Sequence, residues 1–206
     1  MNSNKLAFIG GSGIYKLDIL NEVIEHDIVS SFGKPSSKIL EGKVNGNSIF
    51  FLSRHGVGHR LSPSEINYRA NIECLKQLGI TDIISLSAVG SLRDELDPET
   101  FVIVDQFIDR TINRKKTFFE SGIVAHVPMA QPTSKVLMDL SKNILEDLKI
   151  KHAYGGIYIA MEGPLRVRLN DGGWINIGSN EWTSLASNTS GTINEILAER
   201  TDNPKW

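Results

Sequence analysis

The sequence predicts an α/β protein in which helices cover the faces of a mixed or parallel sheet. Short apolar runs that suit strands alternate with segments whose apolar residues recur every three or four positions, as in helices. Several of the apolar runs end in loops that are rich in glycine and serine. The 206 residues, 40% hydrophobic and 22% charged, suit one sizeable soluble domain.

The first strands are expected before residue 54. Residues 6–9 form an apolar run that ends at the loop Gly10–Gly13, which predicts a strand followed by a tight loop. Residues 37–44 and 48–53 flank an Asn45-Gly46-Asn47 turn, which predicts a hairpin.

Two segments carry the spacing of helices. Residues 63–78 are predicted as the first helix because Ser62, Pro63 and Glu65 form a capping-box start. A second helix is expected over about 134–149. The repeating apolar residues are Ile66, Ala70, Cys74 and Leu78 in the first segment, and Leu137, Leu140, Ile144 and Leu148 in the second.

Three further strands are expected in the second half, at a buried run over 82–87 and at 101–104 and 154–161. The composition then changes near residue 165. All eight Phe, four Tyr and five His lie before this point, and all three Trp lie after it. Residues 1–164 are therefore predicted to form one domain, incomplete at its C-terminal side. Residues 165–206 are predicted to be a divergent tail and not a separate domain.

Charge and cysteine content exclude several classes of protein. The net charge of -2 argues against a general nucleic-acid or membrane-surface binder. Cys74 is the only cysteine, so there is no disulfide framework and a cytoplasmic location is expected. On its predicted helix Cys74 is interpreted as a small buried residue. The N-terminal apolar run is too short for a signal peptide, and no segment approaches membrane-spanning length.

The segment LSRHGVGHRLSP, residues 52–63, concentrates basic side chains in a loop after a predicted strand. His55 and His59 could bind a metal only from one helix face, and Gly56 and Gly58 break that geometry. Arg54 at the strand end suits a phosphate better, because its planar guanidinium can donate two hydrogen bonds at once.

Two other loops support an anion site. Ser12 follows the first strand within a glycine loop, and Ser87 ends the predicted strand 82–87. In open α/β sheets, ligands collect at the carboxyl ends of strands. Ser12, Arg54 and Ser87 are therefore predicted to converge on one oxyanion pocket.

Three features have alternative interpretations. The Gly10–Gly13 loop could belong to a dinucleotide-binding domain, but residues 22–27 do not clearly supply the acidic end of a second strand. Residues 105–111 carry two acids and a base that suit a structural ion pair. His126 lies among apolar neighbours, where either a structural histidine or the wall of a substrate or subunit contact fits.

Eight segments carry a resemblance to a known family: IGGSGIY at 9–15, FGKPS at 32–36, SRHGVGH at 53–59, PSEINYRANI at 63–72, SAVGSLR at 87–93, VDQFIDRT at 104–111, HVPMA at 126–130 and MEGP at 161–164. Together they resemble the trimeric purine nucleoside phosphorylase family, most closely its 5′-methylthioadenosine phosphorylase branch. The resemblance implies a nucleoside phosphorylase fold, with a central mixed β-sheet flanked by helices, and a homotrimer. It also implies phosphorolysis of methylthioadenosine to adenine and 5-methylthioribose 1-phosphate, without a metal and without a cofactor besides the co-substrate phosphate.

The resemblance also implies roles for particular residues. It assigns phosphate contacts to Ser12, Arg54, His55, Ser87 and the backbone of Ala88. His59 would lie near the phosphate or ribose, and His126 would reach a neighbouring subunit's pocket beside the 5′ group. During reaction the ribose becomes oxocarbenium-like, phosphate stabilises that cation and captures C1′, and the purine leaves with a hydrogen bond or proton at its ring nitrogen.

The resemblance stops after MEGP, where the chain reads LRVRLNDGGWINIGSNEW. The family continues there with ribose contacts and with an aspartate that holds the purine, so no catalytic residue is assigned. We expect that a frameshift or gene-end error produced the tail, that the base site is missing, and that apolar surface is exposed. A 6-oxopurine nucleoside or methylthioinosine phosphorylase, and a non-catalytic phosphate-binding remnant, stay open as alternatives.

Overall fold

The computed structural model describes residues 4–11, 20–119, 122–161, 165–168 and 174–177. The chain divides into two units, which are described separately. Unit 1 holds residues 1–89 and 113–124, and unit 2 holds residues 90–112 and 125–206. The predicted domain boundary at 164/165 adjoins residues outside the description and stays a prediction.

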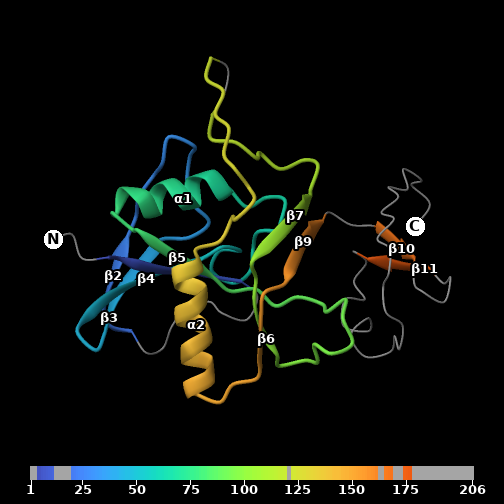
Figure 1. Cartoon of the computed structure of the whole chain (residues 1–206). Helices are drawn as coiled ribbons and strands as arrows, with labels where there is room; N and C mark the ends of the chain where they lie inside the picture. The colour runs from blue at the N-terminus through green and yellow to red at the C-terminus, as the bar shows by residue number, and fades with distance from the viewer. Residues whose placement is uncertain (1–3, 12–19, 120–121, 162–164, 169–173, 178–206) are drawn as a thin grey trace. The chain divides into compact units, whose positions relative to one another are not determined.

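Unit 1 contains a five-stranded mixed sheet with α1 packed on it, as the predicted α/β class requires (Figure 1). The strand order is β2-β3-β4-β1-β5. β1 runs parallel to β4 and β5, whereas β3 is antiparallel to both β2 and β4. The strands are β1 (Leu6–Gly10), β2 (Asn21–His26), β3 (Ile39–Val44), β4 (Asn47–Ser53) and β5 (Asp82–Ser85).

The predicted hairpin is confirmed as the β3–β4 pair. Asn45 and Gly46 both have positive φ, 51° and 80°, which is the geometry of a tight hairpin turn with the right twist. The parallel register then places Gly10 opposite Ser53 and Ile9 opposite Ser85. The carboxyl ends of β4, β1 and β5 therefore meet at one edge of the sheet.

A buried apolar cluster joins α1 (Tyr68–Gln77) to the centre of this sheet. Phe50 and Leu52 of β4 are 1% and 0% exposed, and Cys74 and Leu75 of α1 are both 0% exposed. Burying side chains of this size contributes about 1.5–3 kcal/mol each. The cluster consists of Ala7, Ile9, Ile39, Phe50, Leu52, Cys74 and Leu75.

The predicted start of the first helix is wrong. Ser62 and Glu65 do interact, since the Ser62 hydroxyl donates to the Glu65 carboxylate at 2.7 Å. They close only an isolated turn, and α1 begins at Tyr68 with the Asn67 side chain accepting from the Ala70 N–H at 3.1 Å. Asn67 caps the helix in place of Ser62 because the Asn67 side chain also bonds to a residue outside the helix.

The loop that contains FGKPS, residues 32–36, binds the asparagines at the start of α1. The Asn67 side-chain amide donates to the Phe32 carbonyl at 2.7 Å. The Asn71 side-chain oxygen Oδ1 accepts from the Ser36 N–H at 2.8 Å, and its side-chain Nδ2 donates to the Ser36 hydroxyl at 3.0 Å. Two asparagines of PSEINYRANI therefore fix the loop of residues 32–36 against α1.

Unit 2 contains α2 and three two-stranded sheets. The predicted second helix is confirmed, capped by Ser134. The predicted strand 154–161 is wrong in one respect, because Gly155 and Gly156, with φ of 85° and 157°, divide it into two strands. The elements are β6 (Phe101–Ile103), β7 (Gln106–Arg110), α2 (Lys135–Asp147), β8 (His152–Tyr154), β9 (Ile157–Met161), β10 (Leu165–Arg168) and β11 (Trp174–Ile177).

The strand pairs of unit 2 place the segment 105–111 in the fold. β6 pairs with β8 and β7 with β9, both in parallel, while β10 and β11 are antiparallel. Most of the segment 105–111 is therefore strand β7, and the ion pair expected there stays a prediction. Its two acids bond to nearby backbone, Asp105 to the Gly156 N–H at 3.0 Å and Asp109 to the Thr111 N–H at 2.8 Å.

Two further expectations in unit 1 need correction. β2 was not predicted, because its sequence NEVIEH is almost wholly exposed at the sheet edge and lacks a clear apolar alternation. β5 was expected to be buried, but it lies at the other edge and is only partly buried. The strand order also excludes the dinucleotide-binding alternative, in which the second strand lies parallel beside the first.

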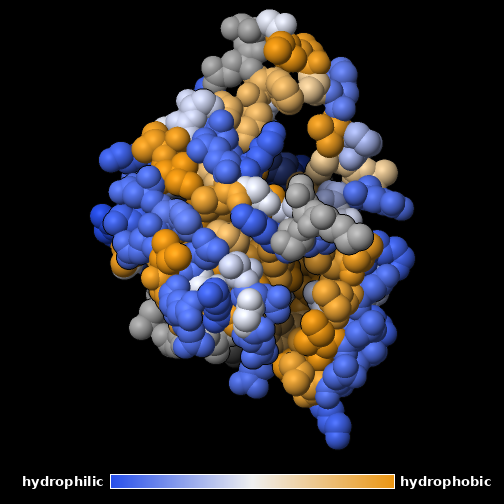
Figure 2. Space-filling view, turned by 90° about the vertical axis from the view of Figure 1, so that its left-hand side faces the viewer, coloured by the Kyte–Doolittle hydropathy of each residue, from blue (hydrophilic) through white to orange (hydrophobic). Residues whose placement is uncertain are grey.

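α2 exposes an apolar stripe. Val136, Leu140, Ile144 and Leu148 recur every four residues and are 76%, 52%, 47% and 63% exposed. Figure 2 shows apolar side chains gathered at the surface on the face that it displays. An exposed stripe of this kind can receive another element or another chain, while the expectation that a missing C-terminal part exposes apolar surface stays a prediction.

Cys74 is buried, as predicted. Its thiol is 0% exposed and donates to the Ile28 carbonyl at 3.7 Å. Burial raises the pKa of the thiol, and the Glu73 carboxylate adds to this rise. No helix within the described segments is long and apolar enough to cross a membrane.

We predict that Cys74 resists alkylation by iodoacetamide at pH 8 in the folded chain. A buried thiol with a raised pKa holds little thiolate, and the thiolate is the nucleophile. Mass spectrometry of the intact chain measures the extent of modification, with the same chain in urea as the control. Equal alkylation rates in buffer and in urea would show that α1 is not packed as described.

Candidate functional site

The candidate site lies where β4, β1 and β5 end together. The Arg54 N–H donates to the Gly10 carbonyl at 3.1 Å, and the Leu86 N–H donates to the Ile9 carbonyl at 2.9 Å. These bonds continue the sheet by one residue past β4 and β5. Each loop therefore leaves the sheet at a fixed point, and this is where open α/β sheets bind their ligands.

Arg54 reaches across β1 to the loop after β5. One terminal nitrogen, Nη1, donates to the Ser87 hydroxyl at 2.5 Å and to the Leu86 carbonyl at 3.3 Å. Among the described residues no carboxylate pairs with Arg54. The structure thus brings two of the predicted residues together and leaves a positive charge there that no acidic side chain of the described segments balances.

Gly11 makes room for this guanidinium. A Cβ atom at Gly11 would lie 2.6 Å from Arg54 Nη2 and 2.9 Å from the Leu86 carbonyl oxygen. Both distances are shorter than any ordinary contact of a methyl group, so a larger residue would displace the arginine. The glycine loop after β1 therefore contributes to the site through its missing side chain.

His55 contacts Arg54 at the site and is buried, with 5% of its surface exposed. Its Nδ1 lies 2.9 Å from the Leu61 carbonyl oxygen, and its Nε2 lies 3.3 Å from Arg54 Nε. The carbonyl can only accept and the guanidinium can only donate. The ring therefore carries its proton on Nδ1 and is neutral.

Burial lowers the pKa of His55 below its ordinary value of 6.5; the Leu61 bond opposes this effect, and the charges of Arg54 and His59 add to it. The unfolded chain therefore binds the second ring proton of His55, which gives the imidazolium cation, more readily than the folded chain does. The resulting contribution to folding stability is complete above pH 6.5 and is lost as the pH falls through the lowered pKa.

His59 covers one side of the His55 ring. The two ring centroids lie 4.3 Å apart with an angle of 19° between the planes, which is a stacked arrangement. The chain turns back to allow this contact through positive φ angles of 73° at Gly56, 77° at Gly58 and 55° at His59. Both nitrogens of His55 face protein partners in this arrangement, and the absence of a metal stays a prediction.

The other predicted residues differ in what the structure says of them. Ser12 lies outside the described residues. Ala88 follows Ser87 in the exposed part of the loop. His126 is exposed in a loop of unit 2, which is described by itself, so its place beside a neighbouring subunit's pocket stays a prediction.

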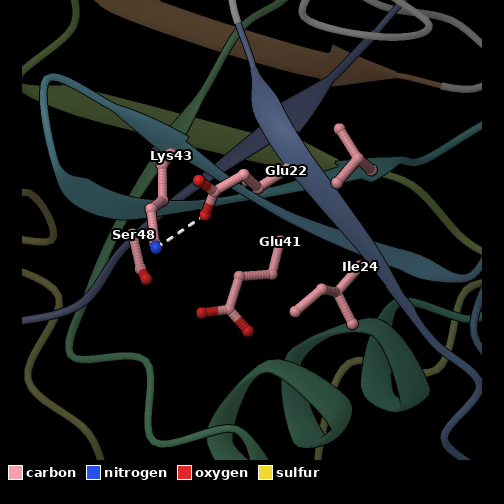
Figure 3. Close-up of a pocket in the computed structure, with 7 residues that line it drawn as sticks. Glu22, Ile24, Glu41, Lys43 and Ser48 are labelled. Atoms are coloured by element: carbon pink, nitrogen blue, oxygen red, sulfur yellow. Dashed lines mark hydrogen bonds and ion pairs between the residues drawn. The ribbon is translucent and has the colours of Figure 1, made fainter.

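A cavity of about 350 Å³ elsewhere in unit 1 does not suit an anion (Figure 3). Its charged residues pair with each other or with a neighbour. Lys43 bonds to Glu22 at 2.7 Å, and Glu41 lies 2.8 Å from His26. Two carboxylates and one paired lysine would repel phosphate, in contrast to the uncompensated charge of Arg54.

Comparison with known proteins places the chain in a family. The family described as the phosphorylase superfamily matches residues 5–168. The chain belongs to the phosphorylase superfamily. The match includes β1, β4 and β5, and therefore the whole Arg54–Ser87 geometry.

The similar proteins within the superfamily share one name. The chain is 54% identical over 159 residues to S-methyl-5′-thioadenosine phosphorylase of Rhodospirillum rubrum, covering 77% of this chain and 54% of the relative. It is 52% identical over 164 residues to the protein of the same name from Bradyrhizobium diazoefficiens, covering 80% and 56%. The chain therefore spans about half the length of these relatives.

Solved structures in the superfamily share the fold. A methylthioadenosine phosphorylase from an Antarctic soil metagenomic library is 43% identical with a TM-score of 0.73, covering 80% of this chain and 58% of that one. The methylthioadenosine phosphorylase of Schistosoma mansoni without ligand is 33% identical with a TM-score of 0.75, covering 79% and 65%. The nucleoside phosphorylase fold implied by the resemblance is thus confirmed.

Sequence reasoning missed three contributors to the site. Gly11 was noted only as part of a glycine loop, and its contact with Arg54 depends on a neighbouring strand. Leu61 and Leu86 contribute through their carbonyl oxygens, which no side-chain pattern reveals. The signal that could have pointed to Gly11 is the adjacent pair Gly10-Gly11, directly after a strand that the sequence predicts well.

Proposed function

We propose that the protein to which this chain corresponds catalyses the phosphorolysis of 5′-methylthioadenosine to adenine and 5-methylthioribose 1-phosphate. The observation that carries the proposal is the Arg54–Ser87 contact at the end of three strands, in a chain 54% identical to a methylthioadenosine phosphorylase. A guanidinium that pairs with no described carboxylate and lies beside a hydroxyl suits the oxygens of a doubly charged phosphate.

Phosphate plays two parts in this reaction. As the glycosidic bond lengthens, the ribose gains positive charge, and a bound phosphate stabilises that charge and then captures C1′. Arg54 and Ser87 hold the phosphate by directed hydrogen bonds, so its approach to the sugar becomes an intramolecular step. The departing adenine needs a proton donor at its ring nitrogen, and no described residue is assigned to that role.

The proposal retains the other expected contacts. Ser12 and the Ala88 backbone complete the phosphate contacts, His55 belongs to the phosphate site beside Arg54, and His59 faces the ribose. His126 reaches a neighbouring subunit's pocket in a homotrimer that works in the cytoplasm, in purine and methionine salvage, without a metal or further cofactor. Two observations bear on these contacts: the HVPMA segment lies within the matched residues 5–168, and His59 stacks on His55.

A non-catalytic phosphate-binding remnant is the second candidate. The observation that favours it is that the Arg54–Ser87 contact suits an anion, while no described residue is assigned to protonate the departing base. In this case the chain binds phosphate but does not cleave a nucleoside.

One assay separates the candidates. The purified chain is incubated with methylthioadenosine, methylthioinosine or inosine, with and without phosphate, and the released base is measured by chromatography. Phosphate-dependent release of adenine supports the proposed enzyme, and preferred release of hypoxanthine supports a 6-oxopurine phosphorylase. No release, with saturable phosphate binding by a folded chain, supports the remnant. A folded chain that neither binds phosphate nor releases a base contradicts both candidates.

A further inference from the structure

The hydrogen bonds of His55 leave its ring no proton to donate to a ligand. Nδ1–H is directed at the Leu61 carbonyl oxygen at 2.9 Å. Nε2 faces Arg54 Nε at 3.3 Å and must be the acceptor in that contact. A ring in this state cannot act as a cationic side-chain ligand of phosphate.

We infer that His55 is a positioning residue that orients the Arg54 guanidinium through a fixed neutral ring, and that His59 braces this ring by stacking on it. The inference rests on the proposed function, because it takes phosphate as the ligand of Arg54. It changes the role of His55 from a side-chain ligand of the anion to a support of the residue that binds it.

Two contacts fix the direction in which Arg54 points. His55 Nε2 accepts from Nε, on the inner edge of the guanidinium. The Leu86 carbonyl and the Ser87 hydroxyl hold Nη1 on the outer edge. Since the guanidinium is planar, contacts at Nε and Nη1 define its plane and leave little rotation about its bonds. A fixed arginine loses less conformational freedom when it binds an anion.

The loop 55–61 in turn fixes His55. The Leu61 N–H donates to the His55 carbonyl at 3.0 Å, while the Leu61 carbonyl accepts from the His55 ring at 2.9 Å. This pair of bonds closes a short loop whose turn depends on Gly56 and Gly58. The loop thus holds both the backbone and the ring of His55.

His59 has a conformation that needs a compensating contact. Its φ of 55° is uncommon for a residue with a side chain and costs about 1–2 kcal/mol in the absence of other interactions. The stacked contact at 4.3 Å with the buried ring of His55 is such an interaction. His59 is itself exposed, so it shields one face of the His55 ring from water.

Matched substitutions test the inference in the full chain. His55→Asn keeps a donor near the Nδ1 position but has no acceptor at the Nε2 position. His55→Gln places its side-chain oxygen near the Nε2 position, where it can accept from Arg54. We expect His55→Asn to weaken binding of inorganic phosphate about tenfold or more and His55→Gln to stay within about threefold of the wild type. His59→Ala should weaken binding, whereas His59→Phe, which retains a flat ring, should not.

Nitrogen NMR supplies a readout that does not depend on phosphate. In the wild type we expect the His55 ring to be protonated at Nδ1 only at pH 7, and the Arg54 Nε–H signal to exchange slowly with water. His55→Asn should lose this slow exchange and His55→Gln should keep it. A proton on His55 Nε2, or fast exchange in the wild type, would overturn the inference even if phosphate binds.

The outcomes separate the two proposals. If the wild type does not bind phosphate but the NMR results are as expected, the proposed function fails and the positioning of Arg54 by His55 holds. If phosphate binds and both His55 variants bind it as the wild type does, the proposed function stands and the positioning role is wrong.

Discussion

Replacing Arg54 by alanine should remove about half or more of the thermal stabilisation that phosphate gives to the chain. A ligand present at about 100 times its Kd stabilises the folded state by about 2.7 kcal/mol. Arg54 supplies the positive charge at the three strand ends, and charge-assisted hydrogen bonds of this kind contribute about 1.5–3 kcal/mol. Losing them should weaken phosphate binding about 10- to 100-fold, which is measured as the dependence of Tm on phosphate concentration.

Arg60→Ala is the matched control. Arg60 lies six positions further along the same segment, is exposed, and donates from Nε to the Val57 carbonyl at 3.0 Å. The substitution removes the same charge without touching the Arg54–Ser87 contact. Equal losses of phosphate stabilisation in both variants would mean that general attraction, and not the described site, holds the anion.

Gly11→Ala should impair both the site and the fold. The added methyl group would approach Arg54 Nη2 to 2.6 Å and the Leu86 carbonyl oxygen to 2.9 Å. The arginine can move away, but the backbone carbonyl is fixed by the β1–β5 pairing. We expect the displaced guanidinium to lower phosphate affinity about tenfold or more, and the crowding to cost about 1–3 kcal/mol of stability. Phosphate titration and urea unfolding measure the two effects.

Gly46→Ala separates these effects. Gly46 has a φ of 80° in the hairpin turn, and a Cβ atom there would meet nothing within 4 Å. The substitution should reduce stability by about 1–3 kcal/mol through backbone strain and leave phosphate affinity unchanged. If Gly46→Ala weakens phosphate binding as much as Gly11→Ala does, the loss reflects stability alone and the steric account of Gly11 is wrong.

The convergence of Arg54 and Ser87 could be predicted because it follows from strand ends. The runs 6–9, 48–53 and 82–87 are mostly apolar and end in polar or glycine-rich loops, so the sequence predicts that they are strands and where each strand ends. Parallel neighbours then place their carboxyl ends at one edge. The hairpin at Asn45 and Gly46 could also be predicted, since its turn needs residues that tolerate positive φ.

The parts that could not be predicted depend on contacts between distant segments. α1 begins at Tyr68 because Asn67 binds the loop at Phe32, which no local capping pattern reveals. The tautomer of His55 depends on the Leu61 carbonyl and on Arg54, so the family resemblance implied a phosphate ligand where the geometry gives an acceptor for the arginine. Local signals determined the strand ends, whereas tertiary contacts determined what each side chain does there.

Isothermal titration of inorganic phosphate into the wild-type chain tests the central claim most directly. The claim is that the ends of β4, β1 and β5 form an anion site around Arg54 and Ser87. The account predicts saturable binding at one site per chain, which Arg60→Ala retains and Arg54→Ala loses. Binding that is absent in the folded wild type, or that persists unchanged in Arg54→Ala, would contradict it.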